Sequence, residues 1–208
     1  MPHGHSHCCG QEHDHDDDTP DRGSQFSLYM KIDTERVECL NETTEGSGKL
    51  VFKPWDQRLD TTQFVESDAD EELLFNIPFT GNIKLKAIIV IGGEDDYHPS
   101  VMRLYRNRPN MTFDDTNCVP DQEFDLQPDH TGDLEYATKI ARFSQTGHLS
   151  IHFPKNFGAD TTKVYYIGLK GDFMAAPRHL VTITNYEARA NPADHKTKTM
   201  DSVGHQIF

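Results

Sequence analysis

The residues with the clearest ligand chemistry gather at the start of the chain. His3, His5 and His7, followed by two thiols and two further histidines, supply the soft nitrogen and sulfur ligands that zinc, copper and nickel prefer. Their spacing matches no closed zinc site, and the surrounding Asp and Gly residues show no apolar periodicity. We therefore expect a solvated, disordered tail over residues 1–24, with a metal site at His3, His5 and His7 as the alternative.

No catalytic constellation stands out in the remainder of the chain. The sequence holds no G-x-S-x-G, H-E-x-x-H, Walker or G-x-G-x-x-G motif. Several later histidines are isolated in the sequence and are expected to be surface or hydrogen-bonded side chains: His98, His148, His152 and His179. Because no candidate nucleophile has a visible base, we expect neither an enzyme nor a cofactor.

An acidic turn at Glu94, Asp95 and Asp96 follows a Gly-Gly pair. Its charges would repel a phosphate group instead of holding one. Together with loop carbonyls, the three carboxylates could chelate calcium, but a solvated acidic turn is the favoured reading. We expect no metal at this turn.

Basic and aromatic side chains cluster at Arg103, Tyr105, Arg106 and Arg108, in a chain that is otherwise strongly acidic. Arg and Tyr often anchor protein interfaces, because their planar groups give a large contact area with few lost rotamers. If Met102 points inward, Arg103 and Tyr105 point outward. The cluster either binds a protein partner or pairs internally with neighbouring acids, and the sequence leaves both readings open.

The cluster follows a segment that reads as the central strand of a packed sheet. From Ile83 to Ile91 one face is apolar throughout and the second only at its far end. Four consecutive β-branched residues disfavour a helix there. A half-buried strand at Leu73–Phe79 precedes it, with Pro78 at an edge or bulge and a turn at Gly81-Asn82.

Further short strands are expected at residues 50–55, 138–143, 149–153, 163–171 and 179–188. In the third of these, Ser150 and His152 are expected to face outward. Residues 26–40 read either as a short helix or as an irregular lead-in strand, and residues 61–66 as one helical turn. Strands this closely spaced leave no room for helical crossovers, so the fold class is an all-β antiparallel sandwich or jelly roll. We expect one domain over residues 25–195 and a flexible tail over 196–208.

Composition limits the partners of the chain. Its 208 residues carry a formal net charge of -14, which opposes binding to nucleic acid or to an anionic membrane surface. No apolar run is long enough for a membrane span, and the N-terminus lacks the pattern of a signal peptide. The four cysteines show no C-x-x-C spacing and are expected to be free thiols. We expect a monomer.

Several segments, in the right order, resemble one known family. They read VECLNE, DTTQFVESDADEELL, KLKAIIVIGG, PSVMRLYRNRPNMTFDD, YYIGLKGD and YEARANPADHK. Together they resemble the PITH module, the proteasome-interacting domain found in a thioredoxin-like protein, over roughly Phe26 to Lys196. No thioredoxin domain or C-x-x-C precedes them, so the chain resembles a stand-alone PITH protein and no redox activity is carried over.

The resemblance implies a jelly roll like that of galactose-binding domains and of the Doc subunit of the anaphase-promoting complex. It also implies a cytoplasmic and nuclear protein that associates with the regulatory particle of the 26S proteasome as an adaptor or regulator. The alternative function is a jelly roll that binds a small ligand or carbohydrate at its loop rim.

Overall fold

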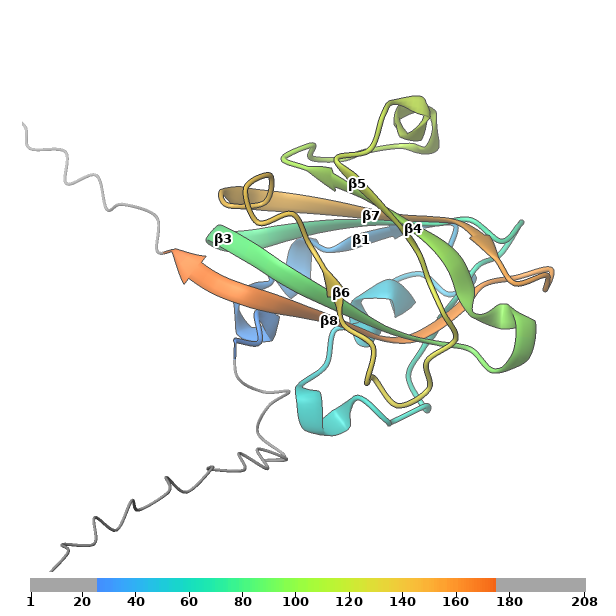
Figure 1. Cartoon of the computed structure of the whole chain (residues 1–208). Helices are drawn as coiled ribbons and strands as arrows, with labels where there is room; N and C mark the ends of the chain where they lie inside the picture. Colours follow the sequence, from blue (N-terminus) through green and yellow to red (C-terminus); the bar gives the residue numbers. More distant parts are fainter. Residues whose placement is uncertain (1–25, 175–208) are drawn as a thin grey trace, which may run out of the picture. The chain divides into compact units, whose positions relative to one another are not determined.

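The computed structural model describes residues 26–174 (Figure 1). Eight strands run through this part: β1 (Glu38–Leu40), β2 (Val65–Glu66), β3 (Leu73–Gly92), β4 (Pro99–Arg106), β5 (Gln122–Asp125), β6 (Tyr136–Ala137), β7 (Thr146–Asn156) and β8 (Lys163–Met174). Short 3-10 turns connect them: η2 (Tyr29–Lys31), η3 (Thr34–Arg36), η4 (Ser47–Val51), η5 (Trp55–Gln57), η6 (Asp95–Tyr97) and η7 (Phe113–Asn117). Residues 26–174 contain no α-helix, and none of their helical turns has the length and hydrophobicity that a membrane crossing requires.

Strand β3 belongs to both layers of the fold. Its first half pairs with β1 and β7, placing Phe75 opposite Cys39 and Ile151. Its second half pairs with β8 and β6. The register is irregular between Pro78 and Ile83, and Figure 1 shows the strand bending sharply back at this point. The first layer is therefore β1, the first half of β3, β7, β4 and β5, and the second is the rest of β3 with β8, β2 and β6.

The main core lies between these layers. Phe75 is fully buried and meets Phe52 and Phe153 edge-on, with ring centres 6.1 and 5.9 Å apart. From the second layer, Ile88 and Val90 join the same cluster. Full burial of one such side chain stabilises the fold by roughly 1.5–3 kcal/mol, so the paired halves of β3 contribute much of the stability.

The structure confirms the antiparallel sandwich and the central strand. Ile88 and Ile89 are both fully buried, as the loss of polar alternation at the end of the strand predicted. Pro78 lies at an irregularity in the pairing, and the expected turn at Gly81-Asn82 is a bend within one continuous strand. Residues 26–40 are neither of the two expected elements alone, because η2 and η3 precede the short strand β1.

Three of the expected elements are wrong. Residues 50–55 form no strand: Leu50 and Val51 end the turn η4, in which Glu42 accepts hydrogen bonds from the amides of Gly46 and Gly48, and Trp55 begins the turn η5. Residues 138–143 also turn, with the amide of Phe143 bonded to the carbonyl of Lys139. Residues 61–66 end in strand β2 instead of a helical turn. The strand expected at 179–188 and both expected tails, 1–24 and 196–208, lie outside the described residues.

Candidate interaction site

The four residues of the predicted Arg and Tyr cluster lie on β4 and the loop that follows it. Arg103 faces β5, where its Nε donates to Oε2 of Glu123 at 2.6 Å. The two residues are direct cross-strand partners, so the register of β4 on β5 positions this ion pair. Both side chains are about one-third to one-half exposed, and such a pair contributes at most about 1 kcal/mol. Arg103 is therefore engaged internally.

Tyr105 corrects the sequence prediction that its side chain points outward. Its side chain is fully buried in a small cluster with Leu74 and Met111. Its hydroxyl donates to the carbonyl of Thr116 at 3.0 Å, and burial raises the pKa of the phenol. Alternation along β4 does place Tyr105 on the outer face of the first layer. The loop over residues 107–121 folds back over this face and covers the side chain. Tyr105 therefore supports this loop from beneath.

Arg106 and Arg108, the other two arginines of the cluster, differ in their surroundings. The backbone amide of Arg106 donates to Oδ2 of Asp121 at 2.8 Å, and its guanidinium donates to the carbonyl of Arg142. Arg108 is exposed, with its guanidinium carbon 5.6 Å from the ring centre of Tyr105 and one nitrogen against Sγ of Cys118. Tyr105 and Arg106 thus hold the loop in place, Arg103 pairs with β5, and Arg108 is exposed at the start of the loop.

A hollow of about 390 Å³ opens beside Arg108. Its lining includes Pro109, Met111, Asp115 and Cys118. Asp115 and Thr112 form a capping box at the start of η7. The hydrogen bonds that Asp115 accepts from the amide and hydroxyl of Thr112 lower the pKa of its carboxyl group. The loop is therefore braced internally and presents Arg108 from a defined surface.

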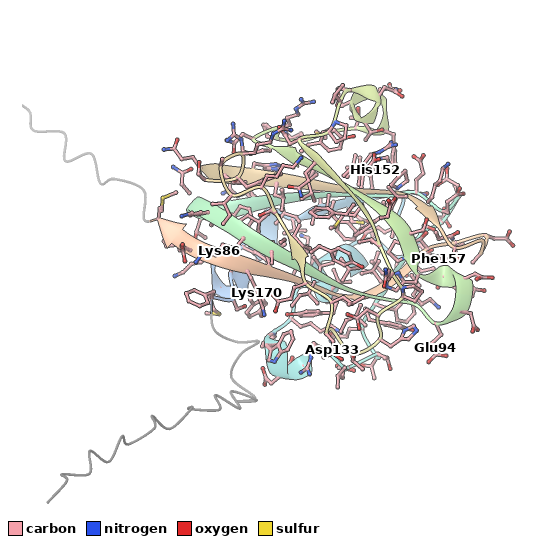
Figure 2. All side chains as sticks on the ribbon, viewed as in Figure 1. Lys86, Glu94, Asp133, His152, Phe157 and Lys170 are labelled. Atoms are coloured by element: carbon pink, nitrogen blue, oxygen red, sulfur yellow. The ribbon has the colours of Figure 1, made fainter. Side chains whose placement is uncertain are left out.

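His152 is buried on the same outer face, although the sequence predicted it to be exposed. It lies on β7 opposite Arg103 and Leu74, and Figure 2 shows it on the side of the molecule that carries the η7 loop. Its Nε2 is 3.7 Å from Oε2 of Glu72, and neither ring nitrogen makes a hydrogen bond within residues 26–174. Burial, and then the charge of Arg103, lower its pKa to about 4. It is a neutral side chain in ordinary conditions.

Within residues 26–174, the remaining sites that the sequence suggested show no assembled metal or catalytic group. His98 bonds through Nδ1 to the carbonyl of Pro99 at 2.7 Å, and burial lowers its pKa and that of His148. No group of three or more His, Cys, Asp or Glu side chains within residues 26–174 is arranged to hold a metal ion. Cys39 and Cys118 are free thiols, as expected. The proposed ligands His3, His5 and His7, the thiols Cys8 and Cys9, and His179 lie outside the described residues.

Comparison with known proteins supports the resemblance seen in the sequence. The sequence model of the PITH domain family matches residues 18–190. PITH domain-containing protein 1 from Homo sapiens is 60% identical over 210 aligned residues, which cover 100% of each chain. A protein of the same name from Dictyostelium discoideum is 41% identical over 188 residues, covering 90% of this chain and 93% of that one.

Among solved structures, the CBM32-1 and CBM32-2 domains of ZmpB from Clostridium perfringens are similar in fold. The TM-score is 0.51 at 12% sequence identity, covering 74% of this chain and 38% of that chain. At this identity the similarity concerns the β-sandwich alone.

Proposed function

The chain belongs to the PITH domain family, and we propose that it is a non-enzymatic protein-interaction module that associates with the regulatory particle of the 26S proteasome as an adaptor or regulator. The family match over residues 18–190 carries this proposal, because the resemblance to the PITH module implies a proteasome partner. We also propose that the protein is located in the cytoplasm and the nucleus.

The environment of the titratable side chains supports a binding role over catalysis. A general base must lie within hydrogen-bonding reach of the proton that it takes, with access to a substrate. His152 and His98 are each buried, and the pKa of Cys39 is raised by burial and by the charge of Glu42. Such a thiol stays protonated and unreactive.

The docking face that we propose is the loop over residues 107–121. Arg108, Pro109 and Asn110 are exposed at its beginning, and Val119 near its end is 85% exposed. An exposed Arg beside apolar side chains has the composition of an interface anchor. Because Tyr105 and Arg106 fix the loop to the sheet, a partner would meet a surface that loses little conformational entropy on binding.

Affinity purification of the full-length protein tests this proposal. Tagged wild-type protein should recover regulatory-particle subunits, and Arg108→Glu should lower the recovery about tenfold, the loss expected from an anchor worth about 1.4 kcal/mol. Lys155→Glu is the matched control, since Lys155 is exposed and lies about 20 Å along β7 from Leu149, the partner of Arg106. The melting temperatures of both variants should match that of the wild type.

The two possible failures are distinguishable. Equal recovery of subunits by the wild type and by Arg108→Glu would show that the 107–121 loop is not part of the interface. The proposed partner would still stand. Wild-type protein that recovers no regulatory-particle subunits, under conditions in which the proteasome stays intact, would overturn the proposed partner.

The alternative of a carbohydrate-binding jelly roll has less support from the residues. The single tryptophan, Trp55, would be the natural stacking platform for a sugar ring. Arg58 instead lies over its ring at 4.1 Å from the centre, and Tyr166 packs edge-on against it at 6.3 Å. Its ring is therefore engaged within the protein.

A further inference from the structure

Three large aromatic side chains are exposed at one end of the sandwich. Phe64, Tyr97 and Phe157 are 36%, 41% and 42% exposed. They come from separate segments: the stretch before β2, the turn η6, and the turn that follows β7. Figure 2 shows Phe157 and Glu94, which lies next to η6, at the same end of the molecule and far from Lys86. Exposed aromatic residues that converge from separate loops indicate a contact surface, because isolated ones would be scattered.

Lys163 joins the rings of Phe64 and Tyr97, and a backbone hydrogen bond places Phe157 beside the turn that carries Tyr97. The ammonium of Lys163 lies 4.7 Å from the ring centre of Phe64 and 5.5 Å from that of Tyr97. On the other side, the amide of Phe157 donates to the carbonyl of Asp96, the residue before Tyr97, at 3.2 Å. We name Phe64, Tyr97, Phe157 and Lys163 the rim strip.

The backbone holds the rim strip in place. The amide of Gly93 donates to the carbonyl of Lys163 at 2.7 Å, and a Cβ at Gly93 would lie 2.7 Å from that of Tyr97, so only glycine permits this approach. Next to Phe157, the side chain of Asn156 donates to two carbonyls of the β7–β8 turn and accepts from the amide of Gly158. A surface ordered in advance binds at a lower entropic cost.

The charges around the rim strip are acidic. Glu94, Asp95 and Asp96 are exposed beside Tyr97, and Asp160 is exposed in the turn after Phe157. The one cation of the strip, Lys163, is paired with Oε2 of Glu66 at 3.1 Å. The net field therefore attracts positive charge and repels phosphate groups, whether in nucleic acid or in a lipid headgroup.

We propose that the rim strip binds a protein segment in which Arg or Lys stands next to an aromatic or aliphatic side chain. The exposed parts of the aromatic rings supply apolar contact area, and the acidic turn supplies charge complementarity. This surface is independent of the proposed proteasome-docking loop. β4 separates the two, because it starts at Pro99, just after Tyr97, and ends at Arg106, about 23 Å away.

A random peptide library displayed on phage, selected against the full-length protein, tests the proposal. Selected peptides should be enriched in Arg or Lys adjacent to apolar residues, and synthetic copies should bind in fluorescence anisotropy. Tyr97→Ser with Phe157→Ser should weaken the binding about tenfold or more, the loss expected from two aromatic anchors. Val119→Ser, an exposed apolar residue of the other surface, should leave the affinity unchanged.

A second variant removes negative charge from the acidic turn while keeping its fold. Glu94→Gln with Asp95→Asn keeps the shape of the turn, since Asp95 has φ 52° and Asn tolerates that conformation. It should weaken the binding and reduce its dependence on salt. Failure to select any basic and apolar peptide, or equal binding of the selected peptides to wild type and both variants, would overturn the proposal. So would selected peptides that are acidic, or basic without apolar residues.

Discussion

The buried imidazole of His152 should make the stability of the protein depend on pH in the mildly acidic range. His152 is 1% exposed, and neither ring nitrogen has a hydrogen-bond partner within residues 26–174. The groups that face it are Glu72, the residue before β3, Arg103 from β4, and the ring of Phe113 from η7, with ring centres 6.1 Å apart. An uncompensated charge in such a place is unfavourable, so the folded protein keeps this side chain neutral.

The size of the effect follows from the two pKa values. Burial and the charge of Arg103 lower the pKa of His152 from 6.5 to about 4. Between these values the unfolded chain binds a proton that the folded chain does not, so stability is complete above pH 6.5 and falls as the pH approaches 4. The full difference is about 3 kcal/mol, of which about 2 kcal/mol should be lost between pH 7.5 and pH 5.0.

Neighbouring groups change the total but not the share of His152. The pKa values of His98 and His148 are also lowered by burial, which adds to the loss in the same range. The pKa of Glu72 is raised, by burial first and then by Asp70 and Glu71, and a raised carboxyl pKa acts in the opposite direction. A variant that removes only the imidazole is therefore needed to isolate its contribution.

Urea unfolding of the full-length protein at pH 7.5 and pH 5.0 measures this contribution. His152→Leu should lose about 2 kcal/mol less than the wild type between these pH values. At pH 7.5 the variant should be at least as stable as the wild type, because it removes buried polar nitrogens that have no partner. If His152→Leu shows the same loss as the wild type, the imidazole is not held neutral by burial.

Two further substitutions test the packing of β3. Ile89→Asp places a charge at a fully buried position, so it should abolish the cooperative thermal transition and the strand signal in circular dichroism; a retained transition would contradict the placement of the strand. Gly171→Ala would bring a Cβ within 2.1 Å of the carbonyl oxygen of Lys84, and it should destabilise the fold by about 1–3 kcal/mol in urea unfolding. Gly147→Ala, where the nearest atom would be at 3.4 Å, should cost little, and equal costs at the two glycines would refute the argument.

The sequence predicted the fold class and the strand at Ile83–Ile91, because alternation of apolar residues is a local signal. It misplaced Ser150 and His152, which are both buried although they alternate with the core residues of β7. Alternation shows which residues share a face, but it does not show whether a distant loop covers the second face. The cover here is the 107–121 loop, which contributes Met111 and Phe113 without any periodic pattern.

The sequence also could not show which side chains approach one another only after folding, and this limited the prediction of both surfaces. The sequence singled out Arg103, Arg106 and Arg108 as side chains that either bind a partner or pair internally, and partner binding stays a prediction. It could not predict that two of them bind within the protein, because Glu123 and the carbonyl of Arg142 approach only after folding. The rim strip had no signal in the sequence, since its three aromatic members are separated by more than thirty residues and only folding brings them to one end of the sandwich.

Internal ion pairs determine the sign of the charge that the sandwich leaves for partners. Several cations are paired with acids within the described residues: Lys86 with Asp172, Arg103 with Glu123, Lys163 with Glu66, and Lys170 with Glu135. In a chain of net charge -14, each such pair consumes a scarce positive charge and leaves the excess of acids exposed. A partner of the rim strip must therefore bring its own cations. Its association rate should fall as salt screens this attraction, whereas the apolar contacts that hold the complex together should change little.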